Sequence, residues 1–88
     1  MEEYVTDKGY KVSIKSLESH RGICIGGEVQ PNIYYARNSG YKGMEPGVVE
    51  GMEEIIIDTQ RNKLRTVIIR LEDGRTFNPD FLNVVKKD

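Results

Sequence analysis

The chain has 88 residues, of which 38% are hydrophobic and 31% are charged, and its formal net charge is −1. This length suits one domain, residues 1–88, and excludes two independent cores, while the near-zero charge excludes a surface that attracts nucleic acid or anionic lipid as a whole. The lone cysteine, Cys24, excludes an internal disulfide. Residues 1–5 have no signal-peptide pattern and no apolar run reaches the roughly 18 residues that span a bilayer, so we expect a cytoplasmic protein without membrane contact.

Residues 10–29 predict an N-terminal β-hairpin. Residues 10–17 alternate apolar and polar side chains, which places Tyr10, Val12 and Ile14 on one face of a strand. Turn-forming residues follow, and residues 23–29 resume an extended pattern that two adjacent glycines bend or end. Pairing of these two strands with each other is the simplest interpretation.

Residues 30–46 read as a long central loop. Prolines and glycines interrupt them, and neither a period of two nor a period of 3.6 is sustained. Loops of this length within small domains are usually functional or disordered.

Residues 47–85 predict a series of strands. Residues 48–52 and 54–59 indicate two short strands, and residues 64–71 indicate a longer one. Asp73-Gly74 is typical of a type I′ hairpin turn, and Asn78-Pro79 is typical of the start of a short helical turn. Residues 83–85 extend again, and residues 86–88 form a charged, solvated tail. Because no segment carries a helical apolar period over ten residues, the fold class is all-β.

Three features of this half resemble the SH3-like small β-barrels shared by SH3, KOW and Tudor modules. They are Gly47-Val-Val-Glu-Gly51 at the opening strand, the Asp73-Gly74 hairpin, and Pro79-Asp-Phe-Leu-Asn-Val84 where such barrels place a 3₁₀ turn before the last strand. The resemblance implies a small, partly open SH3-like barrel over residues 47–85, preceded by the hairpin and the central loop. The chain contains no tryptophan, so we do not expect it to have the tryptophan-lined groove with which SH3 domains bind proline-rich peptides.

Few residues indicate catalysis. His20 and Cys24 could act as base and nucleophile, but a turn separates them and no third group orients the imidazole, so a surface histidine and a small buried thiol are expected instead. Two possible ligands are too few for structural zinc. The acidic pairs Glu53-Glu54 and Glu72-Asp73 are expected to be solvated charges, since adjacent strand residues point to opposite faces. We therefore expect a protein that is not an enzyme and holds no metal or cofactor.

Two groups of residues are candidates for ligand binding. The central loop combines aromatic rings with a guanidinium, an amide and an ammonium group, a mixture that binds bases, nucleotides or peptides. A basic stripe follows on one face of the next strand pair, and it either binds phosphates or guards a strand edge against aggregation. The tyrosines could instead cover the end of the barrel. The candidate ligand-binding residues are Tyr34, Tyr35, Arg37, Asn38, Tyr41, Lys42, Arg61, Lys63 and Arg65.

These observations leave two functional hypotheses. The first is a non-catalytic module that captures a phosphate-bearing ligand, either a nucleotide or single-stranded nucleic acid. A compact chain of this type could also be a phage or mobile-element protein that sequesters a nucleotide signal or blocks a host factor. The second is a protein-protein interaction domain or a homo-oligomeric assembly domain that uses strand edges and the tyrosine-rich loop. The first predicts a salt-sensitive affinity, and the second an affinity that depends on aromatic burial.

Overall fold

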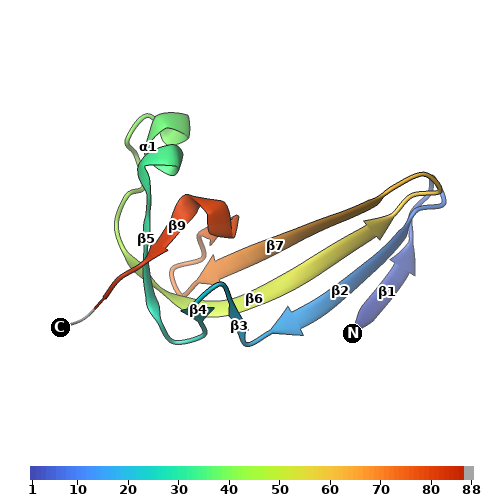
Figure 1. The fold of residues 1–88 in the computed structure, drawn as a ribbon, viewed down its shortest axis with the longest axis horizontal. Coiled ribbons are helices and arrows are strands. Elements are labelled where there is room, and N and C mark those ends of the chain that lie inside the picture. The colour runs from blue at the N-terminus through green and yellow to red at the C-terminus, as the bar shows by residue number, and fades with distance from the viewer. Residues whose placement is uncertain (87–88) are drawn as a thin grey trace.

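The protein is described by a computed structural model over residues 1–86; residues 87 and 88 of the expected tail lie outside the described residues. The predicted all-β class is confirmed (Figure 1). The strands are β1 (Glu2–Val5), β2 (Lys11–Leu17), β3 (Ser19–His20), β4 (Ile23–Cys24), β5 (Glu28–Pro31), β6 (Gly47–Asp58), β7 (Lys63–Leu71), β8 (Thr76–Phe77) and β9 (Leu82–Val84). The helical elements are α1 (Ile33–Ser39) and the 3₁₀ turn η1 (Pro79–Phe81).

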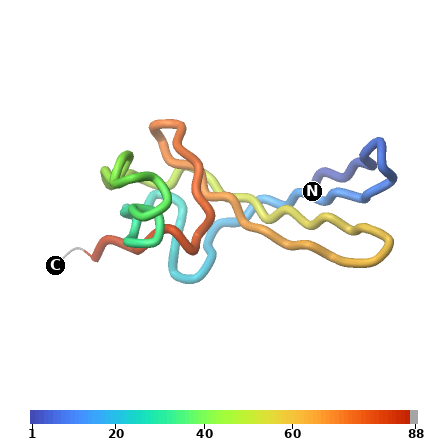
Figure 2. Tube along the Cα trace, turned by 90° about the horizontal axis from the view of Figure 1, so that it is seen from above, coloured from blue at the N-terminus to red at the C-terminus, as the bar shows by residue number. Residues whose placement is uncertain are grey.

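The molecule has two regions, which we call the head and the arm. The arm comprises residues 1–16 and 53–66, and the head comprises residues 17–52 and 67–86. Figures 1 and 2 show the arm as a long twisted sheet that projects away from the end carrying α1, β5 and β9. The chain therefore extends over 46 × 28 × 20 Å.

The arm is a four-stranded antiparallel sheet in the order β1-β2-β6-β7. The predicted hairpin over residues 10–29 is wrong, because β2 pairs with β1 and β6, whereas β3 and β4 form a small ladder of their own. The alternation in β2 is confirmed: Val12 is buried and Ile14 is half-buried. Strand β1 was not predicted, since Glu2-Glu3-Tyr4-Val5 is too short and too polar to indicate a strand without its partner.

Strand β6 is one strand of 12 residues where the sequence predicts two. The register of its pairing with β7 shifts between Val49 and Gly51, which is a β-bulge or similar irregularity. A Cβ atom on Gly51 would lie 2.7 Å from an Nη atom of Arg70, so a larger residue here would displace the end of that arginine side chain. Glycine at this position marks a bend within a continuous strand and not its end.

The core lies in the head, where segments distant in the chain meet. Its buried residues are Ile23, Val29, Val49, Met52, Val67, Ile69, Leu71, Phe77 and Leu82. Strand β6 connects the regions, because its first residues pair with β5 while the remainder pairs with β2 and β7. No ladder within residues 1–86 joins β9 to β8, so the sheet stays open, as the prediction of a partly open fold requires.

The turn between β7 and β8 differs in type from the prediction. Gly74 has a φ of +93°, but Asp73 has no positive φ, which a type I′ turn would need. Leu71 accepts a hydrogen bond from the amide of Gly74 and donates one to the carbonyl of Arg75. The connection is therefore a three-residue loop that ends with a left-handed glycine. The helical turn predicted at Asn78-Pro79 is confirmed as η1, with the Asn78 side chain accepting from the Asp80 amide at 3.0 Å.

Candidate functional site

The predicted central loop, residues 30–46, is wrong in part because it contains the end of β5 and the helix α1. Asn32 precedes α1, and its side-chain oxygen accepts hydrogen bonds from the amides of Tyr34 and Tyr35 at 3.0 and 3.3 Å. The helix ends at Ser39, and the left-handed conformation of Gly40 allows Tyr41 to donate to the carbonyl of Ala36. An asparagine followed eight residues later by a glycine was the available signal, but two turns are too short for apolar periodicity to show.

The two adjacent tyrosines of α1 have different roles. Tyr35 is half-buried and packs edge-to-face against Phe77 and Phe81, with ring centroids 4.9 and 6.0 Å apart. Tyr34, one residue earlier, is 62% exposed. Tyr35 therefore covers the core, as the alternative interpretation of the tyrosines holds, and the binding candidate at this place is Tyr34.

A cleft of about 640 Å³ lies between α1 and η1. Its two walls are joined by Asn32, whose side-chain amide donates to the carbonyl of Asp80 at 2.8 Å and whose backbone amide donates to Phe81 at 2.9 Å. The residues that line the cleft are Tyr34, Arg37 and Asn38 from α1, and Asn78, Asp80 and Phe81 from η1 and its cap. Three of the predicted ligand-binding residues, Tyr34, Arg37 and Asn38, thus share one concave surface. Phe81 lies on the same surface, although the sequence did not indicate it as a ligand contact.

The electrostatics of the cleft depend on Arg37. This arginine forms no ion pair within residues 1–86, whereas the carboxylate of Asp80 pairs with Arg21 at 2.8 Å. Both side chains of that pair are largely exposed, so the pair is weak. Arg21 nevertheless places a positive charge beside Asp80, which is the acidic residue among those that line the cleft. The guanidinium of Arg37 is therefore available to bind an anionic ligand in the cleft.

A second, smaller hollow of about 190 Å³ lies on the other side of Asn78 and Asp80. It contains His20, Arg21 and Arg65. Arg65 is already bonded to Glu54 through its Nε at 2.9 Å. Of the three residues in the predicted basic stripe, Arg65 is the one that lies near η1, and its charge is already paired with Glu54.

The other two residues of the stripe lie in the arm. Arg61 lies in the turn between β6 and β7, beside Lys8 and Tyr10, and Lys63 begins β7. Figure 1 places this turn at the far end of the molecule from α1. The structure therefore does not bring the basic stripe and the tyrosines into one site, as the sequence-based hypothesis expected.

Tyr41 and Lys42 follow α1 and are exposed, but they do not line the cleft. Tyr41 is one of two non-glycine residues with positive φ within residues 1–86, at +66°. A bulky side chain in this conformation is strained. The segment is held by a hydrogen bond of 2.9 Å from the Ser39 hydroxyl to the carbonyl of Lys42.

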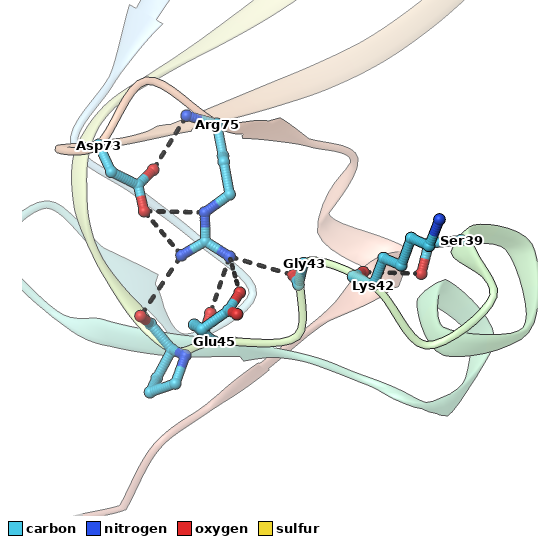
Figure 3. A network of polar contacts seen from close by, with 7 residues as sticks. Ser39, Lys42, Gly43, Glu45, Asp73 and Arg75 are labelled. Carbon is cyan, nitrogen blue, oxygen red and sulfur yellow. Dashed lines mark hydrogen bonds and ion pairs between the residues drawn. The ribbon is translucent and has the colours of Figure 1, made fainter.

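Arg75 anchors the chain that follows α1, a role that the sequence did not indicate (Figure 3). Its guanidinium donates to the carbonyl groups of Gly43, Glu45 and Pro46 at 3.1, 2.8 and 3.4 Å. Its Nε donates to Asp73 at 2.8 Å, and this bond holds the pKa of the Asp73 carboxyl below its usual value. One arginine thus ties residues 43–46 to the loop between β7 and β8.

The residues considered for catalysis are not assembled into a site. Cys24 is exposed, which corrects the prediction of a buried thiol, and its sulfur contacts the carbonyl of Gly22 and not His20. Glu53 pairs with Arg70, and Glu54 pairs with Arg65. Within residues 1–86 no group of three or more His, Cys, Asp or Glu side chains could hold a metal ion.

Comparisons with models of protein families, with curated proteins and with solved structures find no match to this chain. Within the described residues, no helix has the length and apolar character needed to cross a membrane. The resemblance to SH3-like barrels therefore stays a prediction from the turn and strand pattern.

Proposed function

We propose that the chain is a non-catalytic binding module that captures a phosphate-bearing ligand, a nucleotide or single-stranded nucleic acid, in the cleft between α1 and η1. The observation that carries this proposal is the convergence of Tyr34, Arg37 and Asn38 with Phe81 on one cleft. An aromatic surface beside a free guanidinium suits a planar base that carries a phosphate. In a phage or mobile element, such a module would sequester a nucleotide signal.

Each side chain has a role that follows from its chemistry. The rings of Tyr34 and Phe81 offer stacking surfaces, and stacking on an aromatic side chain contributes about 1–3 kcal/mol per base. Arg37 offers a fork of N–H donors that matches two phosphate oxygens. The amides of Asn38 and Asn78 supply both donors and acceptors for base edges, although Asn78 already accepts from the Asp80 amide.

The test is binding of the full chain to two probes, ATP and a fluorescently labelled single-stranded oligonucleotide, each at low and high salt. We expect Tyr34→Ala and Arg37→Ala each to weaken binding about tenfold or more. The matched controls are Tyr4→Ala and Lys15→Ala, which remove an exposed tyrosine and an exposed cation from the arm. Absence of binding for both probes, or equal losses in cleft and control variants, would show the proposal to be wrong.

A second candidate is a protein-protein interaction domain that uses the same end of the head. It is favoured by three large apolar side chains that α1 and the residue after its cap leave exposed: Ile33, Tyr34 and Tyr41. Surfaces rich in exposed tyrosine are common in binding sites for proteins. In this case Tyr34→Ala would abolish partner binding, whereas Arg37→Ala and added salt would have little effect.

A further inference from the structure

The arm has two open edges. Within residues 1–86, strand β1 pairs only with β2, and β7 pairs with β6 along its length but with β8 only at Ile69 and Arg70. The backbone N–H and C=O groups on the outer sides of β1 and of residues 63–68 therefore lack a strand partner within residues 1–86. Open edges of this kind are templates for pairing with another chain.

The two edges carry opposite charges. Strand β1 begins with Glu2 and Glu3, whereas the open part of β7 carries Lys63 and Arg65. The ladders place these residues in common rows across the sheet. One row runs Glu3, Ser13, Ile56, Arg65, and the next runs Tyr4, Val12, Ile57, Leu64.

The number of strands makes the two edges complementary in their backbones as well. All neighbours in the arm are antiparallel, so the outer two of four strands also run antiparallel to each other. Hydrogen-bonded and non-hydrogen-bonded rows alternate from one strand pair to the next in such a sheet. The backbone N–H and C=O groups that point away from the sheet consequently fall on the same rows in β1 and in β7. Strand β1 of another copy can therefore hydrogen-bond to β7 while every row of the sheet keeps its register.

We propose that a second copy of this chain adds its β1 to the open edge of β7, in the register of the existing rows. Glu3 of the added copy then lies beside Arg65, and Tyr4 of the added copy lies beside Leu64. Both apolar residues are exposed in the single chain, Leu64 at 57% and Tyr4 at 52%, so the contact buries them. The contact joins two different edges and leaves one of each free, so it builds a ring or an open row of copies.

The existing ion pairs of these residues do not prevent the contact. Arg65 donates to Glu54, but a guanidinium has five N–H donors and can also donate to a second carboxylate. Glu3 lies 3.8 Å from Lys11, and both side chains are about half exposed, so this pair is weak. Lys63 forms no ion pair within residues 1–86 and adds positive charge diagonally opposite Glu3 of the next copy.

The surface that this proposal uses is in the arm, and the proposed ligand cleft is in the head. Assembly through the edges therefore does not require a ligand in the cleft. Its failure would also leave the binding function untouched.

Sedimentation velocity of the full chain, from micromolar to millimolar concentration, tests the proposal. Because the added strand has only four residues, we expect weak self-association that grows with concentration and decreases with salt. Glu3→Arg and Arg65→Glu should each weaken it about tenfold, since each places like charges opposite one another. Mixing these two variants should restore it, because every contact in the mixture can then join opposite charges.

Three outcomes would overturn the proposal. The native chain could remain a monomer at every concentration, which would mean that the charges only guard the edges. The reversed variants could associate as strongly as the native chain, which would assign the contact to another surface. Finally, each variant could associate more weakly than the native chain, and the mixture of the two could associate no better than either variant alone. This result would mean that residues 3 and 65 do not face each other in the contact. Circular dichroism checks that each variant is folded, and Lys63→Glu, which breaks no ion pair within residues 1–86, is the substitute if Arg65→Glu unfolds.

Discussion

The head gathers apolar side chains from distant parts of the chain into one core, whereas the arm carries its apolar side chains on a projecting sheet. Ile69 in the head is 0% exposed, while the three isoleucines at positions 55–57 of the arm stay half-buried. Val12 is the only buried residue of the arm. The head is therefore stabilised by packing between segments, and the arm mainly by strand ladders and cross-strand pairs.

This difference predicts where substitutions are tolerated. A side chain in a packed core leaves a cavity when it is truncated, but a half-exposed side chain on a sheet leaves only a shallower surface. The arm is also the region whose unpaired edges and apolar residues remain available to a second chain.

The largest effect is expected from truncation in the core of the head. Ile69→Ala should lower the free energy of unfolding by about 3 kcal/mol, because it removes a fully buried side chain. The matched variant Ile56→Ala in the arm should lower it by about 1 kcal/mol, since this position is already half-exposed. Urea denaturation followed by circular dichroism measures both. Equal losses would contradict the comparison and would indicate that the arm is covered in solution.

Arg75→Ala should have the next largest effect, about 1–2 kcal/mol, because three backbone carbonyl groups lose a charged donor. The loss in free energy of unfolding is small for three bonds to a charged donor, because the Arg75 side chain is 24% exposed and water competes for its partners. Arg70→Ala is the control: its partners are the exposed Glu50 and the half-buried Glu53, and Arg70 itself is exposed, so a loss of only a few tenths of a kcal/mol is expected. Similar losses for both arginines would argue against the anchoring role of Arg75.

Asn32→Ala should lower the free energy of unfolding by about 1 kcal/mol, since the cap accepts from two amides of the first turn of α1. It should also weaken ligand binding in the cleft, because Asn32 joins α1 to η1. Thermal unfolding measures the loss of stability, and titration with ATP measures the loss of binding. Asn83→Ala, at an exposed position of β9, is the control and should change neither.

The smallest effect concerns pH. Arg75 lowers the pKa of Asp73 in the folded chain relative to the unfolded chain, so ionised Asp73 stabilises the fold above the unfolded-state pKa. This contribution is lost as the pH falls through the folded-state value, which lies below the ordinary pKa of about 4. Asp73→Asn should therefore be less stable than the native chain at neutral pH, and the difference should shrink in acid. A difference in thermal midpoints that stays constant down to strongly acidic pH would contradict this assignment.

Several elements could be predicted because their cause is local. The alternation in β2, the strand at β7, the loop at Asp73-Gly74 and the turn after Asn78 all follow from side-chain period or from turn residues within a few positions. Predictions that required a partner failed. The expected hairpin over residues 10–29 assumed that neighbouring strands pair, whereas β2 pairs with a segment some 40 residues later.

The candidate site was predicted in its residue types but not in its geometry. Tyr34, Arg37 and Asn38 were identified by their chemistry, and they do line one cleft. Three features depend on contacts between residues that are 29–48 positions apart. They are the opposite wall at Asn78 and Phe81, the different burial of Tyr34 and Tyr35, and the anchor at Arg75. No pattern within a short window reports such contacts.

The all-β class and the positions of most strands follow from local sequence, because they depend on the period of apolar side chains and on glycine, proline and asparagine at the turns. The pairing of strands, the burial of one tyrosine and not the other, and the distance of the basic residues at positions 61 and 63 from the cleft depend on the packed fold. The physical reason is that the pairing of strands and the burial of side chains are set by the packing of distant segments, which the order of residues in any one segment does not specify.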